Sequence, residues 1–146
     1  MKILLISGPN LNQLGQRDPA VYGQQTLAEI DGLVQKRAEE WNAEIRPYQS
    51  NHEGALIDFI QQERSADGLI INPGALGHYS YALRDALVDF PGLKVEVHLS
   101  NIHAREAFRQ QSVTAPVVQG IVAGLGWRGY LAALDALVGL LHEART

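Results

Sequence analysis

The chain has 146 residues, of which 46% are hydrophobic and 19% are charged, a composition typical of a globular domain. Its net charge is −4 and it has no cluster of lysine or arginine, which argues against nucleic acid or an anionic membrane as a partner. It has no cysteine, which excludes disulfides, thiolate nucleophiles and cysteine zinc sites. Only four apolar residues, 3–6, follow Met1-Lys2, too few for a signal-peptide core, and no run reaches membrane-spanning length, so we expect a single domain, residues 1–146, in the cytoplasm.

The first quarter of the chain predicts a strand, a long loop and a helix. Residues 3–7 are a short apolar run that favours a strand, and a loop rich in Gly, Pro, Asn and Gln follows it as far as Gly23. Thr26 and Glu29 then have the spacing of a capping box. Apolar residues recur behind them at helical spacing up to Trp41, which predicts the first long helix.

The middle of the chain repeats this alternation. Residues 44–49 favour a second strand, and residues 69–71, after the Asp67-Gly68 turn, a third. Between these strands, Ser50 and Glu53 repeat the capping pattern and predict the start of a second helix. The buried stripe of that helix is expected to contain Leu56, Phe59 and Ile60.

The last third of the chain predicts two more strands and two more helices. A helix is expected to begin near Ser80, ahead of a fourth strand over residues 94–98 and a fifth over residues 117–123. The final helix carries an apolar stripe on one side, made of Leu131, Leu134, Val138 and Leu141.

Strands that alternate with helices imply right-handed βαβ units and a parallel sheet covered on both faces. We therefore predict an α/β, flavodoxin-like three-layer sandwich with a five-stranded parallel sheet in the order 2-1-3-4-5. Ligands of such folds lie beyond the carboxyl ends of the strands, near the switch in strand order. The segments that leave strands 1, 3 and 4 carry the polar residues Asn10, Arg17, Tyr22, Asn72, His78, His98 and Ser100.

The densest polar block lies at the end of the fourth strand. Side chains alternate along a strand, so Glu96, His98 and Ser100 share one face. A carboxylate two residues from a histidine can orient the ring and determine its tautomer. The chain after His98 indicates a short helix, whose free N–H groups would form a seat for an anion. A single histidine at this edge is more often an ordinary hydrogen-bonding residue, but these neighbours favour an active site.

Several separated blocks of the sequence match one known family in order and in spacing. The blocks are residues 8–15, 17–23, 49–54, 71–75, 82–87, 96–101 and 103–106. With them, the chain resembles the type II 3-dehydroquinate dehydratases over nearly its whole length. This resemblance implies dehydration of 3-dehydroquinate to 3-dehydroshikimate by stepwise anti elimination through an enolate, in the shikimate pathway or in quinate catabolism. It implies no metal, no cofactor and no covalent adduct.

The resemblance also implies catalytic roles. It assigns Tyr22 as the base, although a free tyrosine keeps its proton until about pH 10. Arg17, five residues earlier, could stabilise the phenolate with its guanidinium. His98 is assigned as the acid with Glu96 as its orienting partner, and Asn10 as a residue that helps hold a water at the enolate oxygen.

The substrate-binding residues follow from the same resemblance. The substrate carboxylate is expected on the backbone N–H groups of Leu99 and Ser100. Asn72, His78 and Arg109 match the residues that hold the substrate's hydroxyls and ring. The resemblance further implies a homododecamer, a tetramer of trimers, in which Asp85 reaches a neighbouring subunit's site. Without the family resemblance, each of these residues has an ordinary structural explanation, such as a turn for Asn72 or a surface charge for Arg109.

The chain departs from the family's pattern beside the expected site. Gly77 and Tyr79 flank His78 where threonines are common, and Tyr81 stands where a small β-branched residue is usual. Asp18 replaces the usual glutamate in the loop before Tyr22. These changes remove no assigned catalytic group, but they bear on the shape of the pocket.

Other functions predict patterns that the chain carries weakly or lacks. Residues 124–129 form a literal G-x-G-x-x-G between a strand and a helix, but they lie at the last strand, so we interpret these glycines as close packing and helix entry. A signalling receiver would need acidic residues where the chain has Ser7-Gly8-Pro9, and a flavin carrier would need a phosphate loop there. The five histidines lack zinc-motif spacing. A non-catalytic, flavodoxin-like small-molecule binding module remains the alternative function.

Overall fold

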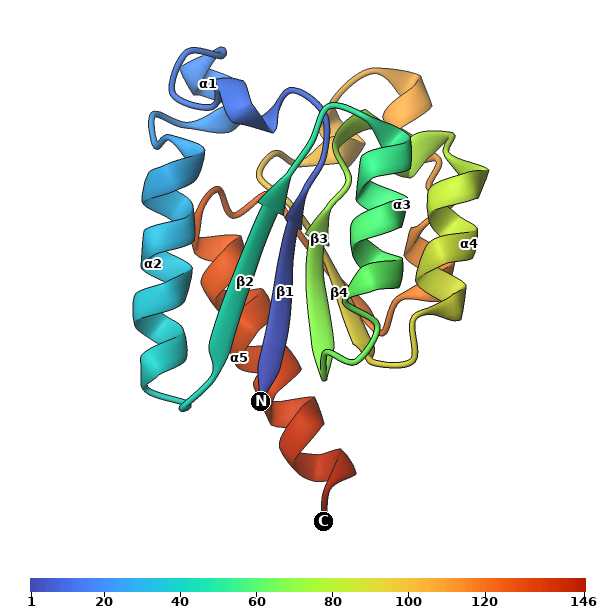
Figure 1. Cartoon of the computed structure of the whole chain (residues 1–146). Coiled ribbons are helices and arrows are strands. Elements are labelled where there is room, and N and C mark those ends of the chain that lie inside the picture. Colours follow the sequence, from blue (N-terminus) through green and yellow to red (C-terminus); the bar gives the residue numbers. More distant parts are fainter.

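The computed structural model describes residues 1–146 and contains a five-stranded parallel sheet between two layers of helices (Figure 1). The strands are β1 (Lys2–Ser7), β2 (Glu44–Gln49), β3 (Gly68–Asn72), β4 (Leu93–His98) and β5 (Gly120–Ala123). Their order in the sheet is 2-1-3-4-5, and every neighbouring pair is parallel. The predicted flavodoxin-like fold is therefore confirmed.

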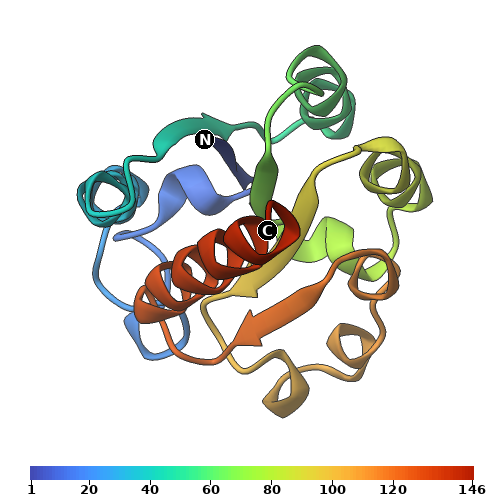
Figure 2. The ribbon, with the colours of Figure 1, turned by 90° about the horizontal axis from the view of Figure 1, so that it is seen from below.

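The helices divide between the two faces of the sheet (Figures 1 and 2). Helices α2 (Leu27–Glu39) and α5 (Arg128–Ala144) cover one face, and α3 (Glu53–Gln62) and α4 (Tyr81–Asp89) cover the other. The short helix α1 (Pro19–Tyr22) lies beyond the carboxyl ends of the strands. Single turns of 3-10 helix form the connections η1 (Leu11–Gln13), η2 (Gly74–His78), η3 (Ile102–Ala104), η4 (Ala107–Gln110) and η5 (Ala115–Val117).

Two separate apolar cores result from the alternation of side chains along the strands. In β1, Ile3 and Leu5 point toward α2 and α5, whereas Leu4 and Ile6 point toward α3 and α4. All four side chains are almost completely buried. A central strand of a parallel sheet is covered on both faces, which explains why residues 3–6 are apolar without interruption. None of the helices has the length and hydropathy needed to cross a membrane.

The predicted helix starts are confirmed at two places and wrong at one. Thr26 and Glu29 form the expected capping box of α2, and Ser80 caps α4 by accepting from the backbone N–H of Leu83. The capping pattern of Ser50 and Glu53 is not used, because His52 is the N-cap of α3. The Glu53 carboxylate instead accepts a hydrogen bond from the Ser80 hydroxyl at 2.5 Å, which ties α3 to α4.

The predicted fifth strand and last helix need smaller corrections. Strand β5 begins only at Gly120, because residues 115–117 form the 3-10 turn η5 around Pro116. In α5, Leu131 is half-buried, and the fully buried position at that level belongs to Tyr130. The buried stripe of α5 therefore begins at Tyr130 rather than at Leu131, because the aromatic ring of Tyr130 packs against the sheet.

A polar network joins α2 to α5 and should contribute to stability. Asp135 of α5 accepts two hydrogen bonds from the guanidinium of Arg37, at 3.0 and 2.9 Å, and one from the indole N–H of Trp41 at 3.0 Å. Arg37 holds the pKa of the Asp135 carboxyl below its ordinary value. The folded protein therefore favours the ionised carboxylate, and this stabilisation is present above about pH 4 and is lost as the pH falls further.

We predict that Asp135→Asn lowers the melting temperature at neutral pH but not at acidic pH, where wild-type Asp135 is protonated. The expected loss is roughly 0.5–1 kcal/mol, because solvent screens a carboxylate that is partly exposed. Calorimetry at several pH values and one fixed protein concentration measures it. Asp58→Asn, a change at an exposed position of α3, is the control. Equal melting temperatures for wild type and Asp135→Asn at neutral pH would contradict the assigned role.

Candidate active site

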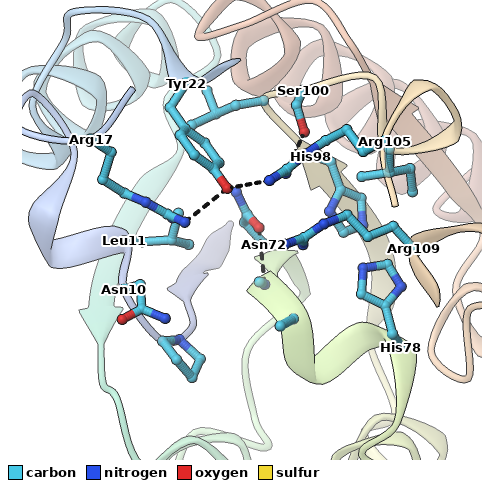
Figure 3. Close-up of a pocket in the computed structure, with 15 residues that line it drawn as sticks. Asn10, Leu11, Arg17, Tyr22, Asn72, His78, His98, Ser100, Arg105 and Arg109 are labelled. Atoms are coloured by element: carbon cyan, nitrogen blue, oxygen red, sulfur yellow. Dashed lines mark hydrogen bonds between the residues drawn. The ribbon is translucent and has the colours of Figure 1, made fainter. Parts of the chain in front are cut away.

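A polar cavity lies at the carboxyl ends of β1, β3 and β4, next to the switch in strand order between β1 and β3 (Figure 3). Its volume is about 90 Å³. Pockets for drug-sized ligands are typically about 300–1,000 Å³, so this cavity suits a small molecule. It is where the predicted topology places a ligand.

Nine of the eleven site residues expected from sequence line this cavity: Asn10, Arg17, Tyr22, Asn72, His78, His98, Leu99, Ser100 and Arg109. The other two lie elsewhere. Glu96 is buried behind His98, and Asp85 is exposed on α4, outside the cavity. Arg105 also lines the cavity and was not assigned a role from the sequence.

Two arginines converge on the phenol of Tyr22. Its oxygen accepts hydrogen bonds from Nη2 of Arg17 at 2.8 Å and from Nη2 of Arg105 at 2.7 Å (Figure 3). The guanidinium carbon of Arg17 also lies 3.7 Å from the centre of the ring. Positive groups that donate to an oxygen favour negative charge on it. The surroundings of Tyr22 therefore suit a phenolate, the form that can take up a proton.

The segment that carries Tyr22, residues 15–23, has glycines with left-handed backbone at both ends. Gly15 and Gly23 have φ values of +92° and +79°, which a residue with a side chain rarely adopts. Between them, Asp18 caps α1 by accepting from the backbone N–H of Ala20 at 3.0 Å. Aspartate is a preferred N-cap, so the departure at Asp18 has a local structural reason.

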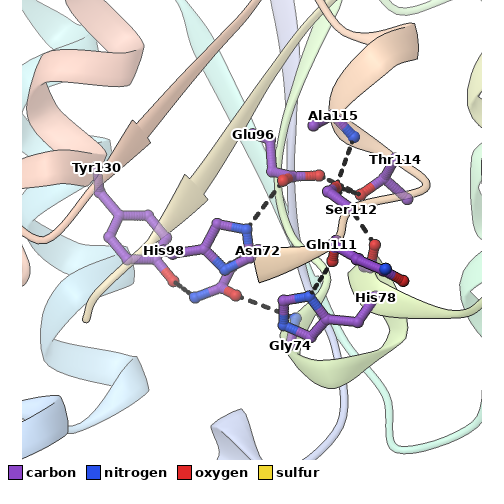
Figure 4. Close-up of polar contacts among 11 residues, drawn as sticks. Asn72, Gly74, His78, Glu96, His98, Gln111, Ser112, Thr114, Ala115 and Tyr130 are labelled. Atoms are coloured by element: carbon purple, nitrogen blue, oxygen red, sulfur yellow. Dashed lines mark hydrogen bonds and ion pairs between the residues drawn. The ribbon is translucent and has the colours of Figure 1, made fainter. Parts of the chain in front are cut away.

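His98 is held by the buried carboxylate of Glu96. The ring Nε2 lies 2.9 Å from Oε2 of Glu96, and the two side chains are 7% and 1% exposed (Figure 4). A carboxylate accepts hydrogen bonds, so Nε2 carries a proton. The other ring nitrogen, Nδ1, has no hydrogen-bond partner in the chain. His98 therefore offers Nδ1 for acid–base chemistry at the cavity.

The side-chain amide of Asn72 is oriented at both ends. Its Nδ2 donates to the hydroxyl of Tyr130 at 2.9 Å, and its Oδ1 accepts from the backbone N–H of Gly74 at 3.1 Å (Figure 4). Tyr130 is completely buried, and this burial raises the pKa of its hydroxyl above the ordinary value. The hydroxyl therefore stays protonated, and Asn72 has one remaining N–H to offer a ligand. Tyr130 was not singled out from the sequence.

His78 and Arg109 form the opposite wall of the cavity. Nδ1 of His78 lies 2.7 Å from the carbonyl oxygen of Gln111, so this nitrogen carries a proton and leaves Nε2 free. Arg109 donates to both carboxylate oxygens of Glu106, at 3.1 and 3.3 Å. The Arg109 guanidinium keeps the pKa of the Glu106 carboxyl below its ordinary value. This pairing holds the arginine in place at the rim.

The other departures lie outside the cavity lining. Tyr79 and Tyr81 are 61% and 71% exposed and do not line it. Gly77 lies behind the wall, where a Cβ would come within 2.8 Å of Cγ of Pro73 and 3.2 Å of Oγ1 of Thr114. None of these three residues therefore contributes to the cavity wall.

The cavity has a positive character. Three arginines line it and no carboxylate does. The backbone N–H groups of Leu99 and Ser100 donate to no acceptor within the chain, as the predicted anion seat requires. No lysine lies among the lining residues, and no group of three or more His, Cys, Asp or Glu side chains has an arrangement that could hold a metal ion. These features favour a small anionic ligand.

The G-x-G-x-x-G sequence serves the turn between β5 and α5. Gly124 and Gly126 have φ values of +87° and +60°. A Cβ on Gly129 would touch Val122 and Val97 at 3.4 Å, in ordinary packing contact. The positive φ values support the interpretation of Gly124 and Gly126 as helix entry, whereas the ordinary contacts at Gly129 do not require a glycine for packing.

Comparisons with known proteins agree on one family. The model of the family described as dehydroquinase class II matches residues 1–138. The 3-dehydroquinate dehydratase of Roseiflexus castenholzii is 59% identical over 140 residues, which cover 95% of this chain and 89% of that protein. The 3-dehydroquinate dehydratase of Lachnospira eligens is 52% identical over 143 residues, with 96% and 97% covered. The crystal structure of the type II dehydroquinase from Butyrivibrio crossotus superposes with a TM-score of 0.91 at 48% identity, covering 94% of this chain and 97% of that one.

We predict that small dicarboxylates such as malonate bind in the cavity and that added salt weakens the binding by screening. Arg105→Gln should lower the affinity about tenfold, because a charged hydrogen-bond donor is lost. Isothermal titration calorimetry measures both effects. Arg128→Gln is the matched control, since this guanidinium stacks over Trp127 and lies outside the cavity. Binding that is indifferent to salt and to Arg105→Gln would contradict the assigned site.

Proposed function

The chain belongs to the class II dehydroquinase family, and we propose that residues 1–146 form one catalytic domain that dehydrates 3-dehydroquinate to 3-dehydroshikimate by stepwise anti elimination through an enolate. Membership makes it a 3-dehydroquinate dehydratase, a hydro-lyase. One observation supports the mechanism above all others. Tyr22, whose phenol oxygen accepts from two guanidiniums, and His98, whose ring is hydrogen-bonded to a buried carboxylate, line the same small cavity.

Tyr22 is the base in this proposal. The substrate is a cyclic β-hydroxyketone, and the proton next to its ketone must leave first. The phenolate of Tyr22 takes that proton, and the electrons of the C–H bond form the enolate. Arg17 and Arg105 lower the energy of the phenolate before the transfer, since both donate to its oxygen. Asn10, whose side chain makes no hydrogen bond within the chain, holds a water molecule that donates to the enolate oxygen.

His98 is the acid that completes the elimination. Its imidazolium gives a proton to the departing hydroxyl, which leaves as water while the enolate electrons form the carbon–carbon double bond. Glu96 stabilises the imidazolium and orients the ring so that Nδ1 is the reacting nitrogen. These residues supply all the acid–base and charge chemistry of the reaction, so the proposal needs no metal, no cofactor and no lysine adduct.

The remaining residues bind the substrate. Its carboxylate sits on the backbone N–H groups of Leu99 and Ser100. Asn72, His78 and Arg109 hold its hydroxyls and ring. The product enters the shikimate pathway, with quinate catabolism as the alternative role, and a biosynthetic enzyme would meet this substrate in the cytoplasm.

We predict that the protein converts 3-dehydroquinate to a conjugated enone, which absorbs in the ultraviolet. Tyr22→Phe and His98→Ala should each lower kcat by about 10²–10⁴-fold, because general acids and bases typically contribute that much. Tyr48→Phe and His142→Ala are matched controls: Tyr48 stacks on Phe59 and His142 packs edge-on against Trp41, both outside the cavity. An inactive wild type would leave a binding module as the function, and a folded Tyr22→Phe with normal kcat would refute the assigned base.

We also propose assembly into a homododecamer, a tetramer of trimers, in which Asp85 completes a neighbour's site. Asp85 is exposed on α4, and Tyr79, Tyr81 and Val88 nearby in sequence are exposed apolar residues of the kind favoured at interfaces.

Light scattering should therefore give a mass of about twelve chains, because the exposed apolar residues are buried on assembly. Asp85→Ala should lower kcat/KM without changing that mass, whereas Asp58→Ala, at an exposed position of α3, should change neither. A fully active monomer would refute both the assembly and the role of Asp85.

A further inference from the structure

The carboxylate of Glu96 has a second hydrogen-bond donor besides His98. Its Oε1 accepts from the hydroxyl of Thr114, while Oε2 accepts from the ring of His98 (Figure 4). Glu96 and Thr114 are 1% and 0% exposed, and no arginine or lysine pairs with the carboxylate. An ionised carboxylate can only accept, so the threonine hydroxyl is the donor. These two hydrogen bonds are the compensation that Glu96 receives for its burial.

The chain holds the Thr114 hydroxyl in this orientation. Ser112 Oγ lies 3.4 Å from Thr114 Oγ1 and accepts from the backbone N–H of Ala115 at 2.9 Å. The backbone N–H of Val113 donates to the carbonyl oxygen of Gly77 at 2.8 Å, and the Ser112 hydroxyl lies 3.3 Å from the same oxygen. Residues 112–115 are thus fastened to the turn that carries His78.

Gly77 leaves the space in which Thr114 sits. A Cβ at position 77 would lie 3.2 Å from the Thr114 hydroxyl oxygen and only 2.8 Å from Cγ of Pro73. Any side chain at this position would therefore press on the group that donates to Glu96. Gly77 and Thr114 form a matched pair, one residue providing the room and the other the hydroxyl.

We propose that Thr114 is a positioning residue for the dehydration, acting on His98 through Glu96; this rests on the proposed function. With its hydroxyl in place, the plane of the carboxylate is fixed and Oε2 points at Nε2 of His98. Without the Thr114 hydroxyl, Oε1 of Glu96 is buried with no hydrogen-bond donor, and the carboxylate is free to rotate toward a different donor. The ring of His98 then loses its fixed orientation, and Nδ1 no longer meets the leaving hydroxyl at a constant angle.

Two substitutions separate this role from packing. Thr114→Val keeps the shape and removes the hydroxyl, whereas Thr114→Ser keeps the hydroxyl and removes a methyl group. We expect Thr114→Val to lower kcat about tenfold with KM unchanged, the effect of losing one hydrogen bond to a charged group. Thr114→Ser should retain near-wild-type kcat. Asp135→Asn, which weakens the fold outside the cavity, should leave kcat unchanged. Wild-type kcat in Thr114→Val, or an equal loss in Thr114→Ser, would overturn the proposal.

A double-mutant cycle tests whether Thr114 acts through Glu96. In a Glu96→Gln background, adding Thr114→Val should cost little further activity, because the two side chains act as one unit. An additive loss would overturn the proposal. Thr114→Ala replaces Thr114→Val in the cycle if the valine variant does not fold.

A readout independent of activity is the NMR signal of the His98 Nε2 proton in the wild-type protein and both variants. This signal should shift in Thr114→Val and stay in place in Thr114→Ser. If the signal shifts in Thr114→Val but the wild-type protein has no dehydratase activity, the proposed function is refuted and the contact of Thr114 with Glu96 is not. An unmoved signal in Thr114→Val would refute the role of Thr114.

Discussion

The burial of the Glu96 carboxylate is the constraint on which the site depends. A charged group buried on an interior strand must have its oxygens hydrogen-bonded, because water does not reach it. The ring of His98 and the hydroxyl of Thr114 meet that need. The consequence for His98 is directional: Nε2 is committed to Glu96, so only Nδ1 is available to a ligand. Strand β4 is itself paired on both sides, with β3 and β5, and this rigid support keeps the direction constant.

His98 and Tyr22, the two residues to which acid–base roles are assigned, lie on structural elements of different kinds. His98 ends a buried strand, whereas Tyr22 ends a four-residue helix between two glycines with left-handed backbone. Tyr22 is held at the cavity by Arg17 from its own segment and by Arg105 from the segment that follows β4. The pairing of Tyr22 with Arg105 therefore depends on how segment 15–23 packs over the cavity. The position of the Tyr22 phenol is coupled to the packing of this segment, and the position of the His98 ring is not.

The sequence predicted the sheet and most of the cavity wall, because both depend on local patterns. Strand order follows from alternating elements, and the nine lining residues lie at the carboxyl ends of strands or in the segments that follow them. It missed Arg105, Tyr130 and Thr114, whose partners lie 83, 58 and 18 residues away along the chain. The wrong prediction of a capping box at Ser50 and Glu53 has the same origin. The Glu53 carboxylate, which the capping box required, accepts a hydrogen bond from Ser80, 27 residues away along the chain. Net charge gives no indication of this local character: a chain with a charge of −4 places three arginines and no carboxylate around its cavity.

Gly77 illustrates how a departure from a family's pattern is best interpreted. From the sequence it is a change beside His78, and its expected effect is on the shape of the pocket. In the structure it lies behind the wall, and its small size matters to Thr114 rather than to a ligand. The hydroxyl that a buried carboxylate needs can come from any element that reaches it, so long as the neighbouring volume is free. A substitution next to a catalytic residue therefore has to be considered with the residue that fills the space it leaves, even 37 positions further along the chain, as Thr114 is from Gly77. The cavity lining alone does not determine how His98 is oriented, because its ring is held through Glu96 and Thr114, which lie behind the lining.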